Sequence, residues 1–228
     1  MPNFDLGAAP LRELNQALHA LPENTNETHW VIDNPGGKHA IACGLDAAVT
    51  VEVNGHVGYY CGGMNQKATI RVAGNAGVGV AENMMSGEVH IQGDASQAAG
   101  ATGNGGLLVI DGNASARCGI SMKGIDIVVK GSIGPMSAFM AQAGNLVVLG
   151  DAGEALGDSI YEAKLFVRGS VASLGADCIE KELGPDEVAA LEGVLARAGV
   201  EGVSADEFRF YGSARRLYHF HVDNADAY

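Results

Sequence analysis

The sequence has little positive charge. Its 228 residues include 14 Lys and Arg against 27 Asp and Glu, so the formal net charge is −13. A nucleic-acid partner would require a basic surface, and this balance argues against one. Aromatic residues are also scarce, at 6% of the chain. An enzyme that acts on a polymer would need an aromatic or acidic row along one face, and the aromatics are too few and out of register for that.

Long apolar runs are absent as well. No stretch approaches the ~18 apolar residues of a membrane-spanning helix. The segment Met1–Asp5 lacks the basic and apolar regions of a signal peptide. We therefore expect a cytoplasmic protein with no membrane partner.

The cysteines are few and show no C-x-x-C spacing. They are Cys43, Cys61, Cys118 and Cys178. Cys61 and Cys118 are separated by three of the repeats described below, or roughly 14 Å at the usual strand spacing, which is too far for a disulfide. Cys43 and Cys61 could lie on adjacent repeats. We interpret this pair as buried thiols, with a redox pair as the alternative.

The dominant feature of the sequence is a ladder of glycines at a constant spacing of nineteen positions: Gly36, Gly55, Gly74, Gly93, Gly112, Gly131, Gly150 and Gly169. Branched apolar residues recur two and four positions before these glycines, which is the pattern of one strand face. The position after each glycine is mostly polar, and the third and seventh positions after it are small. A fixed period near 20 with one strand and small corner residues predicts a solenoid.

This period is too short for a strand-helix-strand crossover and breaks the register of a hexapeptide helix. The sequence therefore predicts an all-β fold: a right-handed parallel β-helix of about seven to eight coils, flanked by short N- and C-terminal helices. At ~4.8 Å per coil this is a rod of about 35 Å. Each ladder glycine would be required by a positive φ or by close backbone approach, so a larger residue at Gly112 should destabilise the fold.

Three regions follow from this pattern. Residues 1–27 form a helical N-terminal extension, because leucines at positions 11, 14, 18 and 21 share one helix face. We expect this helix to cover an end of the core, with docking onto a partner as the alternative. Residues 28–177 form the β-helix, whose first coil is irregular.

Residues 178–228 form a helical C-terminal extension and tail. Gly184-Pro185-Asp186-Glu187 predicts a helix start, and Gly199 a helix end. Residues 204–207 match a capping box. Residues 217–222 alternate like a strand or an extended arm.

No residue emerges from the spacing as catalytic, cofactor-binding or metal-ligating. His219 and His221 share a strand face before Asp223, but a metal site would need further ligands. His56 and His90 occupy different coil positions, so we expect both to be solvated. Several methionines follow the small corner residues, and these could fill the core or form an adaptable contact surface. They are Met84, Met85, Met122, Met136 and Met140.

The segment Gly74-Asn75-Ala76-Gly77, followed by residues 85–93, resembles the GXGXG family. This family includes the C-terminal β-helix of the glutamate synthase large subunit and the C subunit of formylmethanofuran dehydrogenase. The resemblance covers residues 49–176 and extends to 211–217. With its stand-alone length and helical lead-in, the chain is most similar to the small, separate β-helix subunit of N-methylglutamate synthase.

This resemblance implies a non-catalytic structural subunit of a glutamate-synthase-like complex that converts glutamate and methylamine to N-methylglutamate and ammonia. The implied partners are a class-II glutamine-amidotransferase-like subunit and a flavin-binding glutamate-synthase-like subunit. The resemblance implies that FMN, with or without an iron-sulfur centre, is bound by a partner and not by this chain. The alternatives are a formylmethanofuran dehydrogenase-type C subunit and a free-standing β-helix enzyme that acts on a polymer.

Overall fold

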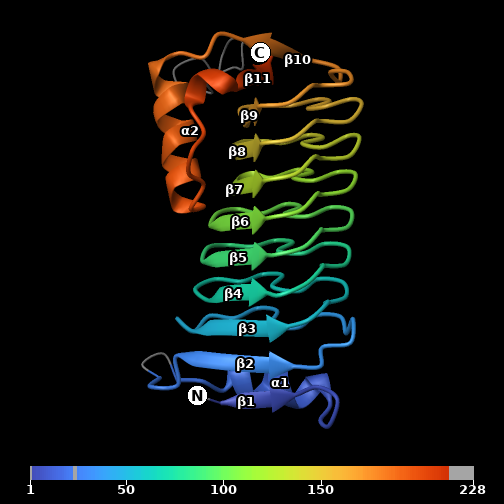
Figure 1. The fold of residues 1–228 in the computed structure, drawn as a ribbon, viewed down its shortest axis with the longest axis vertical. Helices are drawn as coiled ribbons and strands as arrows, with labels where there is room; N and C mark the ends of the chain where they lie inside the picture. Colours follow the sequence, from blue (N-terminus) through green and yellow to red (C-terminus); the bar gives the residue numbers. More distant parts are fainter. Residues whose placement is uncertain (1, 23–24, 216–228) are drawn as a thin grey trace, which may run out of the picture.

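The computed structural model describes residues 2–22 and 25–215, and these form a parallel β-solenoid closed at both ends (Figure 1). One sheet runs the length of the solenoid, with its strands in the order β1-β2-β3-β4-β5-β6-β7-β8-β9-β11-β10. One strand of each coil lies in this sheet: β2 (His29–Asp33), β3 (Thr50–Asn54), β4 (Thr69–Val72), β5 (Glu88–Ile91), β6 (Leu107–Ile110), β7 (Lys123–Val129), β8 (Ala143–Val148) and β9 (Lys164–Val167). The predicted β-helix is confirmed.

The register of the sheet reproduces the period of the sequence. Ile70 pairs with Val89, which in turn pairs with Leu108, so each partner lies one glycine-ladder period further along the chain. Between β2 and β3 the offset is larger, because Trp30 pairs with Val51. The first coil is therefore irregular, as predicted. From Gly55 onward, the apolar positions two and four residues before each ladder glycine point inward and are buried.

The ladder glycines are required by close approach between coils. A Cβ added to Gly112 would lie 2.8 Å from the Gly93 carbonyl oxygen and even closer to the Asp94 carboxylate. The Gly112 N–H donates to that same carbonyl at 3.0 Å, and Gly131 repeats the bond one coil later at 2.9 Å. In the ladder, only Gly36 and Gly55 have a positive φ. At the other ladder glycines, close backbone approach between coils, rather than a positive φ, is therefore the reason that glycine is required.

The polar position after each glycine forms a second ladder. The Asn75 side chain accepts a hydrogen bond from the Asp94 N–H at 2.9 Å, and the Asp94 carboxylate accepts from the Asn113 N–H at 2.7 Å. Ser132 and Asp151 continue the chain of bonds along the corner. Each side chain thus satisfies a backbone donor of the next coil that would otherwise be exposed at the bend.

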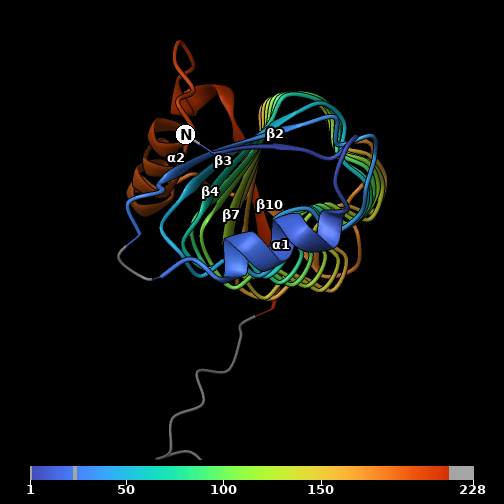
Figure 2. The ribbon, with the colours of Figure 1, turned by 90° about the horizontal axis from the view of Figure 1, so that it is seen from below.

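Two elements close the N-terminal end. α1 (Leu11–His19) lies across the opening of the solenoid and buries Leu14 and Leu18 in the core, as Figure 2 shows from below. The Asn15 side chain anchors α1 by donating to the Ala40 carbonyl and accepting from the Ala42 N–H. The expectation that this helix covers the core is confirmed. The structure adds a strand that the sequence did not predict, β1 (Asn3–Asp5), which pairs in parallel with β2.

α2 (Pro185–Arg197) covers the outer face of the sheet over its last coils. Outward-facing residues three positions before each ladder glycine are polar in β3 to β5 and apolar in β6 to β9. In chain order this row is Glu52, Arg71, His90, Val109, Val128, Val147 and Phe166. The apolar half forms a second core with Leu191, Val194 and Leu195 of α2. The change of character along the row marks where the helix begins to cover the sheet.

The C-terminal end is closed by strands that the predicted helical extension did not include. β11 (Arg209–Ser213) pairs antiparallel with β9, and β10 (Cys178–Lys181) pairs antiparallel with β11. A short 3-10 turn at Ala205–Glu207 precedes β11, and Ser204 and Glu207 form the predicted capping box. Residues 217–222, predicted to be a strand or arm, lie outside the described residues. None of the helices in the described part is long and apolar enough to span a membrane.

Candidate functional site

The most distinctive surface of the solenoid is the bend that follows the ladder glycines. Here the fifth, seventh and ninth residues after each ladder glycine from Gly55 to Gly150 adopt positive φ. After Gly93, for example, these residues are Ala98, Gly100 and Thr102. Their N–H groups alternate in direction: Ala98 donates to Ala116 and Thr102 to Ile120 in the next coil, whereas Gly100 donates to Val80 in the previous one. The backbone at this bend is therefore held from both sides.

The seventh position must be small, because it points into the core. Gly100 and Gly119 share this position with Ala81 and Ala138. A Cβ added to Gly100 would lie 2.5 Å from Ile127 Cδ1. The recurring small residues thus bring the bend against the core.

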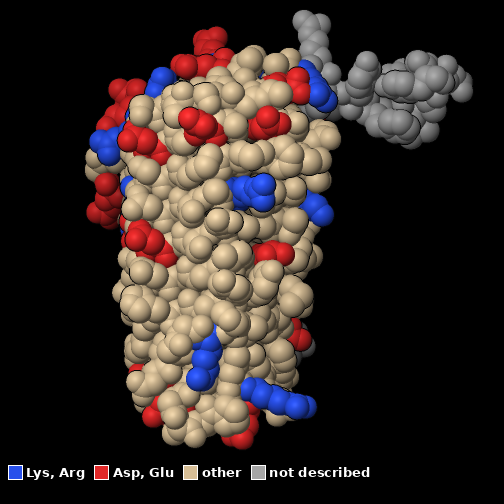
Figure 3. Space-filling model, turned by 90° about the vertical axis from the view of Figure 1, so that its right-hand side faces the viewer, with Lys and Arg blue, Asp and Glu red and all other residues tan. Residues whose placement is uncertain are grey.

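We define the corner face as residues 58–64, 77–83, 96–102, 115–121, 134–140 and 153–159. It lies on the side of the solenoid that Figure 3 presents, where charged side chains are sparse. Its charged residues are Glu82, Arg117, Glu154 and Asp158. Large apolar side chains are exposed on it at 40–53% of their surface, namely Tyr59, Tyr60, Met64 and Met140.

A shallow groove of about 550 Å³ crosses the corner face. The residues that line it come from four consecutive coils: Gln97, Ala116, Arg117, Pro135, Met136, Glu154 and Ala155. The groove mixes apolar walls with one cation and one anion. It has the character of a protein contact surface rather than of an enclosed small-molecule site.

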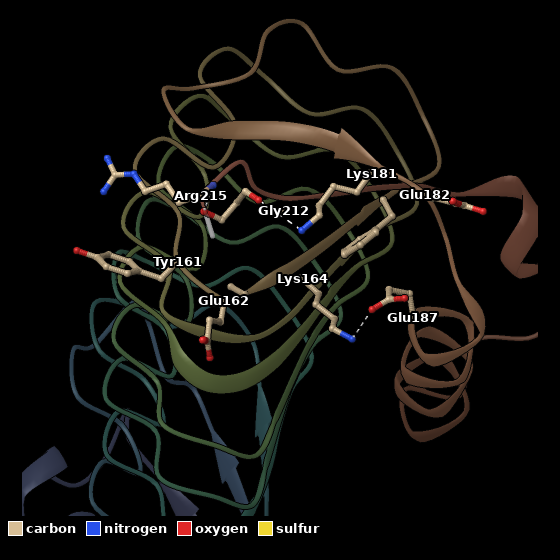
Figure 4. Close-up of a pocket in the computed structure, with 11 residues that line it drawn as sticks. Tyr161, Glu162, Lys164, Lys181, Glu182, Glu187, Gly212 and Arg215 are labelled. Carbon is tan, nitrogen blue, oxygen red and sulfur yellow. Dashed lines mark hydrogen bonds and ion pairs between the residues drawn. The ribbon is translucent and has the colours of Figure 1, made fainter. Parts of the chain in front are cut away.

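A second cavity, of about 420 Å³, lies at the C-terminal end between the last coil, α2 and the closing strands (Figure 4). Its cations largely have partners. Lys164 pairs with Glu187 at 2.9 Å, and Arg215 with Asp177, while Lys181 donates to the Ser213 carbonyl at 3.4 Å. The Lys164 hydrogen bond lowers the pKa of Glu187, so this carboxylate stays charged near neutral pH. These contacts hold α2 and the closing strands against the last coils.

Both histidines expected to be solvated also make specific contacts. His56 is exposed as predicted, and its Nδ1 accepts the hydrogen bond of the Asn75 N–H at 2.9 Å and begins the polar ladder. His90 is only partly exposed. His90 Nε2 lies 2.9 Å from Asp111, which also pairs with Lys130 at 2.7 Å. Coil position alone did not reveal these partners, because each belongs to the neighbouring coil.

The four cysteines are free thiols. Cys43 Sγ donates to the carbonyl of Tyr60, the residue before Cys61, so the two cysteines lie on adjacent coils. Burial raises the pKa of Cys61, with the neighbouring Cys43 adding to the shift, and burial raises that of Cys118 to about 12. Cys61 and Cys118 are therefore inert thiols of a packed core.

The methionines differ in burial, and two of them fill the core as one of the two predicted roles requires. Met84 and Met122 are fully buried, whereas Met85 and Met140 are about half exposed at 51% and 40%. Among the described residues, no group of three His, Cys, Asp or Glu side chains is placed to hold a metal ion. His219, His221 and Asp223 lie outside the described residues.

Comparison with known proteins gives one informative match. The chain is 67% identical over 228 residues to Protein GlxC of Rhizobium meliloti (strain 1021), covering all of both chains. The chain belongs to the GlxC family. No family model matches the sequence, and no solved structure matches the chain. Because the alignment with this GlxC protein runs from end to end, the two closing elements belong to the family along with the coils.

Proposed function

We propose that this GlxC-family chain is a non-catalytic structural subunit of a glutamate-synthase-like complex, specifically of the N-methylglutamate synthase type. The observation that carries the proposal is the corner face. It is a lateral surface six coils long, poor in charge and rich in exposed apolar side chains, on a solenoid with both ends covered. Surfaces of this kind mark protein contacts. The resemblance of the repeats to the GXGXG family supplies the kind of complex.

In this role the chain works by position. The solenoid is a stiff rod, since the bends and rungs tie each coil to both neighbours. It would hold a class-II amidotransferase-like subunit and a flavin-binding subunit in a fixed relation in the cytoplasm. The chemistry, with FMN, would belong to those partners and convert glutamate and methylamine to N-methylglutamate and ammonia.

The test is purification of the tagged chain from its own host, with identification of the co-purifying proteins and an absorption spectrum. Flavin absorbance together with an amidotransferase-like partner supports the proposal. A molybdopterin complex would point instead to the formylmethanofuran dehydrogenase type. Glutamate-dependent consumption of methylamine by the isolated chain would refute a non-catalytic role.

A further inference from the structure

We propose that the corner face binds one specific kind of partner: a protein surface that carries apolar side chains with Lys or Arg side chains among them. This inference rests on the proposed function and deepens it, because it assigns the partner to a face and states the partner's chemistry. The outer face of the sheet and the two ends are less suited to an apolar partner. α1 and the closing strands occupy the ends, and the uncovered strands β3 to β5 are polar on their outer side.

The apolar side chains of the partner follow from the side chains on the face. Tyr59, Tyr60 and Met64 are exposed at one end and Met140 at the other. Val78, Ile120 and Phe139 are half-buried between them. Large apolar side chains gathered in this way on a soluble protein are typical of contact surfaces, and Tyr and Met are enriched there.

The cations of the partner follow from the charges of the corner face. The face carries the acids Glu82, Glu154 and Asp158 and a single cation, Arg117, on a chain of net charge −13. A second copy of the chain packed on this face would bring like charges together, which is unfavourable. A partner that carries cations would instead be attracted, so we choose a different protein over a second copy.

The length and stiffness of the face suit stable binding. Six coils at ~4.8 Å make a strip ~25–30 Å long. A standard interface, which buries ~800 Å² on each partner, extends over a similar distance. Because the backbone of the bend is hydrogen-bonded to the coils on both sides, little conformational freedom remains to be lost on binding.

The test uses two exposed glutamines of one coil. Gln97 lines the groove of the corner face, whereas Gln92 lies on the sheet side of the same coil. The variants Gln97→Lys, Gln97→Glu and the control Gln92→Lys each replace the natural chain in its host, as tagged copies. Exposed positions of this kind change stability little, and melting temperatures verify that all three variants fold.

We expect Gln97→Lys to weaken retention of the co-purifying partner by about tenfold or more at ~0.15 M salt. Gln97→Glu and Gln92→Lys should retain it as the unchanged chain does. Equal retention by all three variants overturns the inference while leaving the proposed function standing. An unchanged chain that purifies without any partner overturns both. A dimer of the purified chain that Gln97→Lys dissociates would assign the face to a second copy and also overturn the inference.

Discussion

Gly112→Ala should destabilise the solenoid strongly although it adds a single methyl group. The new Cβ would lie 2.8 Å from the Gly93 carbonyl oxygen and 2.9 Å from its carbonyl carbon. Real Cβ atoms do not approach backbone this closely, so two coils must separate by several tenths of an ångström. The separation weakens the Gly112-to-Gly93 hydrogen bond at 3.0 Å and the Asn113-to-Asp94 bond at 2.7 Å.

The cost can be estimated from these contacts. Each hydrogen bond contributes about 1 kcal/mol net, and overpacking costs about 1–3 kcal/mol, so we expect a loss of about 2–4 kcal/mol. For a chain of this size that lowers the melting temperature by about 4–16 °C, as measured by calorimetry or circular dichroism.

Gly193→Ala in α2 provides the matched control. A Cβ at Gly193 meets nothing within 4 Å. Because glycine weakens a helix interior, this change should stabilise the protein by about 0.5–1 kcal/mol. A Gly112→Ala protein that melts within a degree of the unchanged chain would show that the rungs do not depend on close approach.

Three further predictions concern other parts of the fold. Leu191→Ala should lower the free energy of unfolding by about 2–5 kcal/mol and speed hydrogen exchange across residues 185–197, because Leu191 is fully buried between α2 and the sheet. Glu192→Ala, on the exposed side of α2, should do neither. Burial raises the pKa of Asp111, but hydrogen bonds from Lys130 and His90 outweigh it and lower the pKa. The stabilisation from Asp111 is therefore present at neutral pH and lost as the pH falls through the lowered pKa, so Asp111→Asn should be less stable at neutral pH and lose less stability on acidification in denaturant titrations. Iodoacetamide at about pH 8 should label the buried Cys61, Cys118 and Cys178 only after unfolding, as counted by mass spectrometry; rapid labelling of Cys118 in the native protein would contradict its burial.

The sequence predicted the coils well because their signal is periodic and local. Ile70, Val89 and Leu108 each carry the same apolar position, and the structure pairs them. β1 escaped prediction because its short segment, Asn3–Asp5, carries no period. β11 escaped because its pairing with β9 is antiparallel and joins segments that α2 separates in the chain, which no local pattern records.

The candidate site was less accessible from the sequence. The corner face is defined by which side chains of a bend point outward, and this depends on the alternating backbone conformation at residues such as Ala98 and Thr102. One signal was present but not used. The row from Glu52 to Phe166 changes from polar to apolar at Val109, and this change predicts that α2 covers the last coils.

That row also limits how the number of coils can vary. In an ordinary solenoid each coil touches only its neighbours, so a coil can be gained or lost with little effect elsewhere. The coils of β3 to β5 meet this condition, since the lattice of rungs and corner bonds repeats from one to the next. The coils of β6 to β9 do not, because α2 has a fixed length and its side chains pack against particular strands of these coils. Coil number is therefore free to change in the N-terminal half of the molecule and is fixed in the C-terminal half.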